Sequence, residues 1–127
     1  MAFRRSVRDD EPMVVSDPLV HATLLGEALE QGPVAVFVFD EELRYVAVNE
    51  YACSLLGYER AELLELRAGA LSEPGSMEEY AAVVQQRQAE GRTRVRRKDG
   101  EVIPLRFRAC ETRVAGLTFY VGVAWPE

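Results

Sequence analysis

The side chains that most often carry chemistry are few in this chain, and they are spaced too far apart to act together. The sequence holds one histidine, His21, and two cysteines, Cys53 and Cys110. A zinc site needs about four such ligands close together, and the cysteines show no metal-like spacing. We therefore predict no metal site, and we expect both cysteines to be reduced rather than bridged.

Clustered carboxylates do not indicate an active site either. Asp40, Glu41 and Glu42 stand in a predicted turn, and Glu78 and Glu79 open a predicted helix, where acidic groups favour the helix dipole. No nucleophile is visibly accompanied by a base, and the chain has no glycine-rich phosphate loop. The sequence predicts no catalytic residues, and a small enzyme built around an apolar pocket is the last of three alternatives.

The stretch 33–58 indicates most clearly how the chain is arranged. Val34 to Phe39 is an apolar run of strand length, followed by an acidic turn and a second strand from Arg44 to Val48. Asn49 is a good helix N-cap, and Gly57 supplies the left-handed residue that ends a helix. This order predicts a hairpin that leads directly into a short helix, with a concave surface above the sheet.

The remaining elements follow from similar local signals. Asp17 and Pro18 are typical of a helix start, and the spacing of Ser76 and Glu79 fits a capping box. Asp99-Gly100 is a strong two-residue hairpin signal. The sequence therefore predicts helices over 17–31, 60–67 and 76–90, and strands over 93–98, 101–110 and 117–125.

The order of these motifs resembles the core of a PAS domain over roughly residues 17–125. Asp40 closes the first strand and Val48-Asn49 the second, and Leu55-Leu56-Gly57-Tyr58 follows. Arg97-Lys98-Asp99-Gly100 is similar to the later hairpin of that family, and 116–123 is similar to its last strand. The resemblance implies a sensory, signal-transduction and interaction domain.

We predict an α+β fold with one domain. It is a PAS-like five-stranded antiparallel sheet with helices inserted between strands 2 and 3 and an N-terminal amphipathic helix. Residues 1–16 are expected to form a flexible arm, and 17–127 the single domain, with a helix over 17–31 and a core over 33–125. The chain stops at Glu127 without a signalling output segment, so we expect either an excised module or a free-standing PAS protein.

Alternation of apolar residues assigns the faces of the sheet. Leu105, Phe107 and Ala109 alternate with polar neighbours and should face the inserted helices. The concave face then has two interpretations that sequence cannot separate: a filled hydrophobic core, or a pocket for a small, largely apolar ligand. The residues expected to line this face are Phe37, Phe39, Val48, Ala52, Leu56, Tyr80, Phe107 and Val121.

The first and last strands are apolar on both faces, so both faces need cover. The candidate for the outer face is the apolar helix 17–31, from this chain or from a partner. This agrees with PAS dimers, in which the N-terminal helix packs on the outer sheet face. We therefore expect a homodimer, with an interface that includes Leu19, Ala22, Leu25, Leu29, Val36 and Tyr120. A purely structural dimerisation module with a filled core is the second alternative.

The resemblance also bears on cofactors. Flavin-binding light sensors of the family and photoactive yellow protein use a reactive cysteine in segments where this chain has none, since 54–109 contain no cysteine. Haem-binding members use a histidine on the long helix, and 76–90 contain none. We expect no covalent flavin or chromophore adduct and no haem, and we interpret Cys53 as structural and His21 as a surface residue. The identity of any ligand stays unknown.

The charge of the chain is uneven along its length. Residues 1–91 carry a net charge of −10 and residues 92–127 a net charge of +4, for a total of −6. The arginines between Arg92 and Arg108 fit a solvated edge that discourages aggregation, or a docking patch for an acidic partner, which includes the acidic helices of a second copy. Negative overall charge and the lack of interleaved aromatic residues argue against nucleic acid.

No apolar run is long enough to span a membrane, and the N-terminus lacks the apolar segment of a secretory signal. We therefore expect a cytoplasmic protein without a membrane partner.

Overall fold

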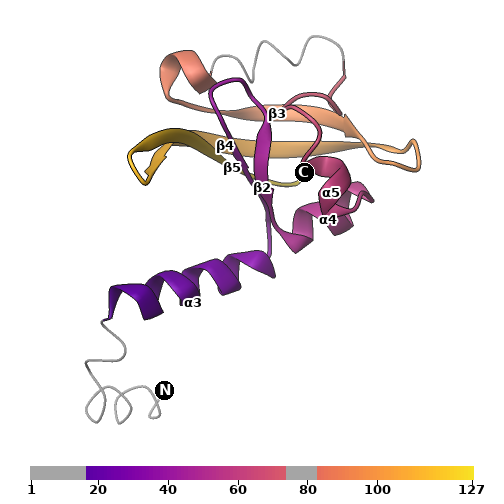
Figure 1. Ribbon diagram of the computed structural model, residues 1–127. Helices are drawn as coiled ribbons and strands as arrows, with labels where there is room; N and C mark the ends of the chain where they lie inside the picture. Colours follow the sequence, from indigo (N-terminus) through magenta and orange to yellow (C-terminus); the bar gives the residue numbers. More distant parts are fainter. Residues whose placement is uncertain (1–16, 74–82) are drawn as a thin grey trace.

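The computed structural model describes residues 17–73 and 83–127, which form one antiparallel sheet with helices on one side and a projecting N-terminal helix (Figure 1). The strands lie in the order β2-β1-β5-β4-β3, so that the last strand of the chain is central. This confirms the predicted α+β, five-stranded antiparallel fold. The elements are α3 (Pro18–Glu30), β1 (Ala35–Phe39), β2 (Tyr45–Val48), α4 (Glu50–Leu56), α5 (Arg60–Leu63), β3 (Gln88–Arg96), β4 (Val102–Val114) and β5 (Leu117–Pro126).

The helix boundaries follow from the capping residues. The side chain of Asp17 accepts hydrogen bonds from the amides of Leu19 and Val20 at the start of α3. The Asn49 side chain accepts one from the Ala52 amide at the start of α4. Gly57 has a φ of 79° and ends α4 with the left-handed turn that glycine adopts without strain.

The β3–β4 hairpin is closed by Asp99-Gly100, and its tip contacts α4. The Arg97 amide donates to the Glu101 carbonyl at 2.8 Å across the turn. The Lys98 amide donates to the Leu56 carbonyl at 3.0 Å, so the hairpin completes the C-terminal end of α4. The Lys98 ammonium lies 2.8 Å from Glu62 and 5.7 Å from the centre of the Tyr58 ring. The far end of the sheet is thereby fixed against the helices.

The core lies between the inner sheet face and α4 and α5. Phe107 on β4 faces Gly91 on β3 and Ala124 on β5, so these three share the inner face. The prediction that Leu105, Phe107 and Ala109 are buried while Arg106 and Arg108 are exposed is confirmed. The larger of two core clusters consists of Ala35, Val48, Ala52, Cys53, Leu56, Leu63, Val95, Leu105, Phe107 and Ala124.

Two predicted helices end earlier than expected. The helix predicted over 60–67 stops at Leu63, because the following residues bond to the first hairpin: the Tyr45 amide donates to Leu66 and the Ala68 amide to Leu43. The helix predicted over 76–90 lies partly outside the described residues, and helix is present over 83–86. Arg87 has a φ of 67°, and β3 begins at Gln88 rather than at residue 93.

The predicted faces of two residues on β5 are wrong. Tyr120 pairs with Phe39 and stacks on its ring at 5.6 Å, so Tyr120 lies on the inner face and is buried. Val121 pairs with Val38 and lies on the outer face. A strand that is apolar on both faces carries no alternation, and a shift of one residue exchanges its faces. Only the pairing with β1 and β4 fixes which residues point inward.

Helix α3 does not cover the sheet of its own chain. It extends away from the domain, and only its C-terminal end meets the other elements (Figure 1). None of its residues is buried. Of the two alternatives for covering the outer face, the helix of the same chain is not in place to do so, because α3 is directed away from the sheet where the chain enters β1. Cover by a partner's helix remains a prediction.

The corrected faces predict different costs for two neighbouring truncations. Tyr120→Ala should lower the free energy of unfolding by about 3–5 kcal/mol, as for other buried aromatic side chains. Val121→Ala, half-buried on the outer face, should cost about 1 kcal/mol or less. Urea denaturation of the two variants measures the difference. A larger loss for Val121→Ala would contradict the face assignment.

Candidate ligand pocket

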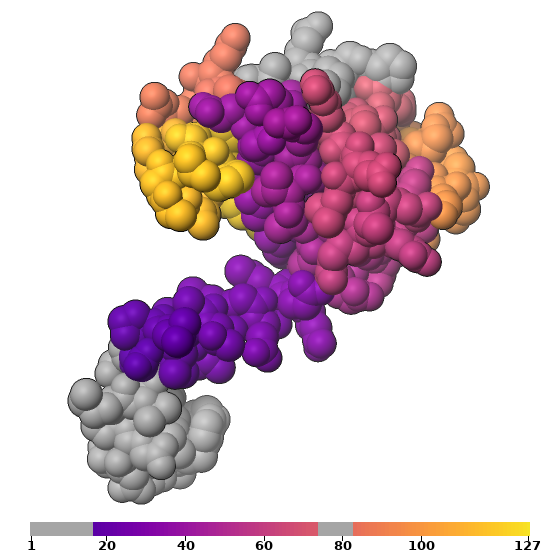
Figure 2. Space-filling view, viewed as in Figure 1, coloured from indigo at the N-terminus to yellow at the C-terminus, as the bar shows by residue number. Residues whose placement is uncertain are grey.

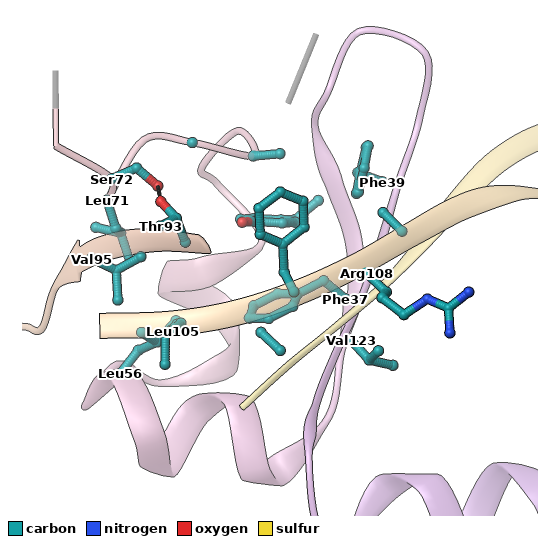
Figure 3. Close-up of a pocket in the computed structure, with 17 residues that line it drawn as sticks. Phe37, Phe39, Leu56, Leu71, Ser72, Thr93, Val95, Leu105, Arg108 and Val123 are labelled. Atoms are coloured by element: carbon teal, nitrogen blue, oxygen red, sulfur yellow. Dashed lines mark hydrogen bonds between the residues drawn. The ribbon is translucent and has the colours of Figure 1, made fainter. Parts of the chain in front are cut away.

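An apolar pocket lies between the inner sheet face and the segment that follows α5 (Figure 3). It is bounded by all five strands, by Leu56 of α4 and by the connection from Ala68 to Ser72. Its cavity volume is about 50 Å³. The lining residues are Phe37, Phe39, Tyr45, Leu56, Ala68, Gly69, Leu71, Ser72, Thr93, Val95, Leu105, Phe107, Arg108, Ala109, Gly122, Val123 and Ala124.

Four of the eight residues predicted for this face line the pocket, namely Phe37, Phe39, Leu56 and Phe107. Val48 and Ala52 are buried in the adjoining core cluster. Val121 lies on the outer face, and Tyr80 is outside the described residues. The structure thus brings the two phenylalanines of β1 together with Leu56 and Phe107, as the alternation on β4 indicated.

The connection at 71–73 is the part of the pocket wall that sequence reasoning missed. It runs beside β3, where the Arg96 amide donates to Leu71 at 2.8 Å and the Glu73 amide donates to Arg94 at 3.0 Å. Ser72 forms an isolated bridge with Val95. These bonds place Leu71 and Ser72 over the cavity. No local signal marks a loop residue as part of a sheet edge, because the partner is more than twenty positions away.

Aromatic rings form one end of the pocket. The ring centres of Phe37 and Tyr45 lie 5.2 Å apart, and those of Phe39 and Tyr45 lie 6.5 Å apart with an edge-on geometry. Aromatic pairs in such arrangements stabilise the fold by more than the burial of their apolar surface alone. Tyr45 was not among the predicted pocket residues, because a bulge between Val38 and Phe39 alters the pairing that places it beside both phenylalanines.

The polar groups of the pocket gather at its other end. The Thr93 hydroxyl donates to the Ser72 hydroxyl oxygen at 3.3 Å, and Thr93 is almost fully buried (Figure 3). Arg108 also borders the cavity, but its guanidinium group points away from it in Figure 3. Among the described residues the pocket is therefore largely apolar: besides the Tyr45 phenol, its side-chain hydroxyls are the Ser72–Thr93 pair, and the one charged side chain that borders it, Arg108, points away.

The volume decides what such a pocket can hold. A water molecule needs about 10–15 Å³ on this measure, whereas drug-sized ligands occupy sites of roughly 300–1,000 Å³. The 50 Å³ of this cavity accommodates a few non-hydrogen atoms. In this conformation the site fits a very small, mainly apolar molecule.

A second surface, which we call the outer stripe, runs along the opposite face of the sheet. It is the row of apolar residues that β1 and β5 direct outward: Val36, Val38, Leu117, Phe119, Val121, Val123 and Trp125. Val36 is buried at the end of the row, Leu117 is 62% exposed, and the other five are half-buried. An adjoining hollow of about 520 Å³ is lined by Val121 and Val123 together with Cys110, Arg108 and Glu90.

The arginines of β3 and β4 flank the outer stripe and are exposed. By register Arg92 lies opposite Arg106, and Glu90 lies opposite Arg108. Several form exposed ion pairs within the chain, including Arg92 with Glu127 at 2.8 Å and Arg94 with Glu73 at 2.8 Å. These pairs agree with a solvated edge, and each contributes little to stability.

Within residues 17–73 and 83–127, no group of three or more His, Cys, Asp or Glu side chains is arranged to hold a metal ion. In the same residues, no helix is long and apolar enough to cross a membrane.

Comparison with known proteins places this geometry among characterised folds. A family model described as PAS domain matches residues 33–124. The structure is similar to a domain of a sensory box sensor histidine kinase/response regulator from Geobacter sulfurreducens, with 24% identity, a TM-score of 0.71, and coverage of 87% of this chain and 97% of the other. No curated protein sequence matches the chain.

Two further solved structures show the same fold at lower identity. The PAS domain of an HTR-like protein from Haloarcula marismortui has 16% identity, a TM-score of 0.75, and coverage of 84% of this chain and 97% of the other. The LOV domain of a blue-light activated histidine kinase from Erythrobacter litoralis has 19% identity, a TM-score of 0.65, and coverage of 76% and 97%.

The residues present do not fit a flavin, the cofactor that light-sensing members of this fold imply. The cavity is several-fold smaller than the lower end of ordinary cofactor sites. Neither cysteine lines it: Cys53 lies on α4 and belongs to the core, and Cys110 is exposed on the outer face. His21 is exposed on α3 and does not border the pocket.

Cys53 is predicted to be chemically inert in the folded protein. Burial raises the pKa of its thiol, although the nearby Arg60 acts in the opposite direction, and a raised pKa lowers the reactive thiolate fraction. In a Cys110→Ser variant, Cys53 is the single thiol, and it should react with a thiol reagent only after unfolding in urea. Rapid modification without urea would contradict a structural role. Wild type in urea, with two reactive thiols, is the control.

Proposed function

This chain belongs to the PAS domain family of sensory and signal-transduction modules, and we propose that it acts as a homodimer that senses a small apolar ligand and signals through α3. The observation that carries this proposal is an apolar helix that the rest of residues 17–73 and 83–127 leaves exposed, on a domain whose sheet has a partly exposed apolar outer face. The pocket would receive the signal, and a signalling protein partner would read the dimer.

The exposure of α3 supports pairing with a second copy. Leu19, Leu24, Leu25 and Leu29 are 75%, 61%, 53% and 47% exposed, although leucine is a residue of protein interiors. Figure 2 shows α3 as an arm that meets the domain at its C-terminal end and otherwise projects from it. Exposed apolar surface of this extent on one helix is typical of an interaction site.

The outer stripe provides a surface for the partner's helix. Thirteen helical residues span about 20 Å, which matches a large part of the length of β5. Charge is also complementary, because Glu27 of α3 is acidic, while Arg106 and Arg108 of β4 lie beside Trp125 and Val123 of the stripe. In a two-fold dimer each α3 would cover the outer stripe of the other copy.

The pocket supports the sensory part of the proposal. It is apolar, lies between sheet and helices, and contains one hydroxyl pair, Ser72 and Thr93, that could orient a polar atom. A ligand of a few non-hydrogen atoms fits the existing space. The small volume equally favours a second function, a dimerisation module whose core is filled and whose signal arises elsewhere.

Native and denaturing mass spectrometry of the purified protein would separate these functions. A non-covalent adduct that is released on denaturation supports the sensory function, and its mass identifies the ligand class. A dimer that binds none of a panel of small apolar molecules at millimolar concentration supports the dimerisation module instead. A monomer at all concentrations would refute pairing.

Leu25→Glu should convert dimer to monomer. Loss of a central apolar contact typically costs about 2 kcal/mol or more, and a two-fold dimer loses the contact twice, so the dimer dissociation constant should rise about a thousandfold. Light scattering coupled to size exclusion, over a range of concentrations, measures the mass. The matched control is Leu64→Glu, which changes an exposed leucine (38%) that directly follows α5 and belongs to neither α3 nor the outer stripe. An unchanged dissociation constant for Leu25→Glu would remove α3 from the interface.

A further inference from the structure

A cluster of polar contacts at the base of α3 has no role in the pocket or the outer stripe. Its centre is Asn49, which is only 5% exposed. The side-chain oxygen accepts from the amides of Val36 at 2.9 Å and Ala52 at 3.1 Å. The side-chain nitrogen donates to the carbonyls of Leu29 at 2.6 Å and Val34 at 3.0 Å. One amide group therefore connects β1, α4 and the last turn of α3.

The hydrogen bond to Leu29 supplies a donor to a helix carbonyl that lacks its usual one. In a continuing helix the Leu29 carbonyl would accept from the amide of residue 33, but Pro33 has no N–H group. The carbonyl receives instead the Asn49 side chain and the Gly32 amide, the latter at 3.2 Å. Rotation of α3 away from its observed direction would break the shorter of these two bonds.

Arg60 makes a second connection next to the first. Its Nε donates to the Val48 carbonyl at 3.2 Å, which holds the side chain against the end of β2. Its terminal nitrogen pairs with Glu30, the last residue of α3, and lies 3.7 Å from Glu50 at the start of α4. The side chain thus lies between α3 and the core and contacts both.

These two connections are well placed to set the direction of α3. The link to β1 consists of Gln31, Gly32, Pro33 and Val34, and α3 has no buried residue that could hold it by packing. At Gly32 an added Cβ would lie 3.2 Å from the Ala28 carbonyl, so the link is also tightly folded. Direction is therefore fixed at the C-terminal end of the helix, by polar contacts.

We propose that Asn49 and Arg60, with Leu29 and Glu30, form a joint that directs α3 away from its own sheet and so presents it to a second copy. The inference rests on the proposed dimer. Without the joint, α3 is free to rotate about the link and to fold back onto the outer stripe of its own chain. The joint makes pairing between chains the favoured arrangement.

Spin-label distances within one chain test the joint directly. Labels are placed at Cys110 and at His21→Cys in a Cys53→Ala background that also carries Leu25→Glu, which removes the partner's influence on α3. The joint predicts a narrow distance distribution. Arg60→Gln should broaden it, and so should Glu30→Gln, since each removes one side of the same contact. The double variant should add little to either single variant.

Arg44→Gln is the matched control. Arg44 also forms two exposed ion pairs, with Asp40 and Glu42 at 3.1 Å each, but in the β1–β2 turn rather than beside α3. The Arg44→Gln substitution removes the same charge as Arg60→Gln, and it should leave the spin-label distance distribution unchanged. An equally narrow distribution for Arg60→Gln and the parent would overturn the joint, and so would equal broadening by Arg44→Gln.

In the unlabelled protein with Leu25 intact, Arg60→Gln should raise the dimer dissociation constant about tenfold, whereas Arg44→Gln should leave it unchanged. A dimer that is indifferent to Arg60→Gln would refute the link between joint and pairing. If the unmutated protein is monomeric throughout, the proposed dimer fails, but the spin-label distances still decide whether the joint directs α3.

Discussion

The arrangement of this domain depends on the hydrogen bonds of one buried amide. Asn49 follows β2, caps α4, bonds to β1 at Val36 and to the preceding link at Val34, and closes the last turn of α3. Each of these segments has a backbone N–H or C=O group that would otherwise lack a hydrogen-bond partner, and the Asn49 side chain supplies that partner. An unsatisfied buried group costs about 1–3 kcal/mol, so the four contacts are strongly coupled. The fold is therefore stiff where sheet, helix and projecting arm meet.

That stiffness explains why the two faces of the sheet differ. The inner face is covered because α4 and α5 follow β2 directly, and the Lys98 amide and side chain fix the hairpin to them. The outer face is uncovered because the same junction sends α3 outward. Because the apolar helix and the apolar sheet face of one molecule are held apart, the helix of one copy is free to cover the sheet face of another. The dimer we propose follows from this geometry rather than from family membership alone.

Sequence predicted those features whose cause is local. Asp17, Asn49, Gly57 and Asp99-Gly100 act on their own neighbours, so their roles could be recognised from residue type and spacing. The face of Tyr120 could not, since β5 is apolar on both sides and only its partners fix the register. The wall at Leu71 and Ser72 was missed for the same reason, because its hydrogen bonds join segments distant in sequence. The direction of α3 depends on both kinds of cause: Pro33 is visible in the sequence, but the donor that compensates for it is not.

The size of the pocket limits how a signal can pass to α3. A ligand shifts a conformational equilibrium only by its difference in affinity for the two states. Small ligands gain at most about 1.5 kcal/mol per non-hydrogen atom, so the few atoms that fit in 50 Å³ provide roughly 5 kcal/mol at the upper limit. A complete switch, from 1:99 to 99:1, needs about 5.5 kcal/mol. A sensor built on this pocket therefore requires two states of α3 that are already close in free energy. An exposed ion pair such as Arg60–Glu30, which contributes little by itself, suits an equilibrium of that kind.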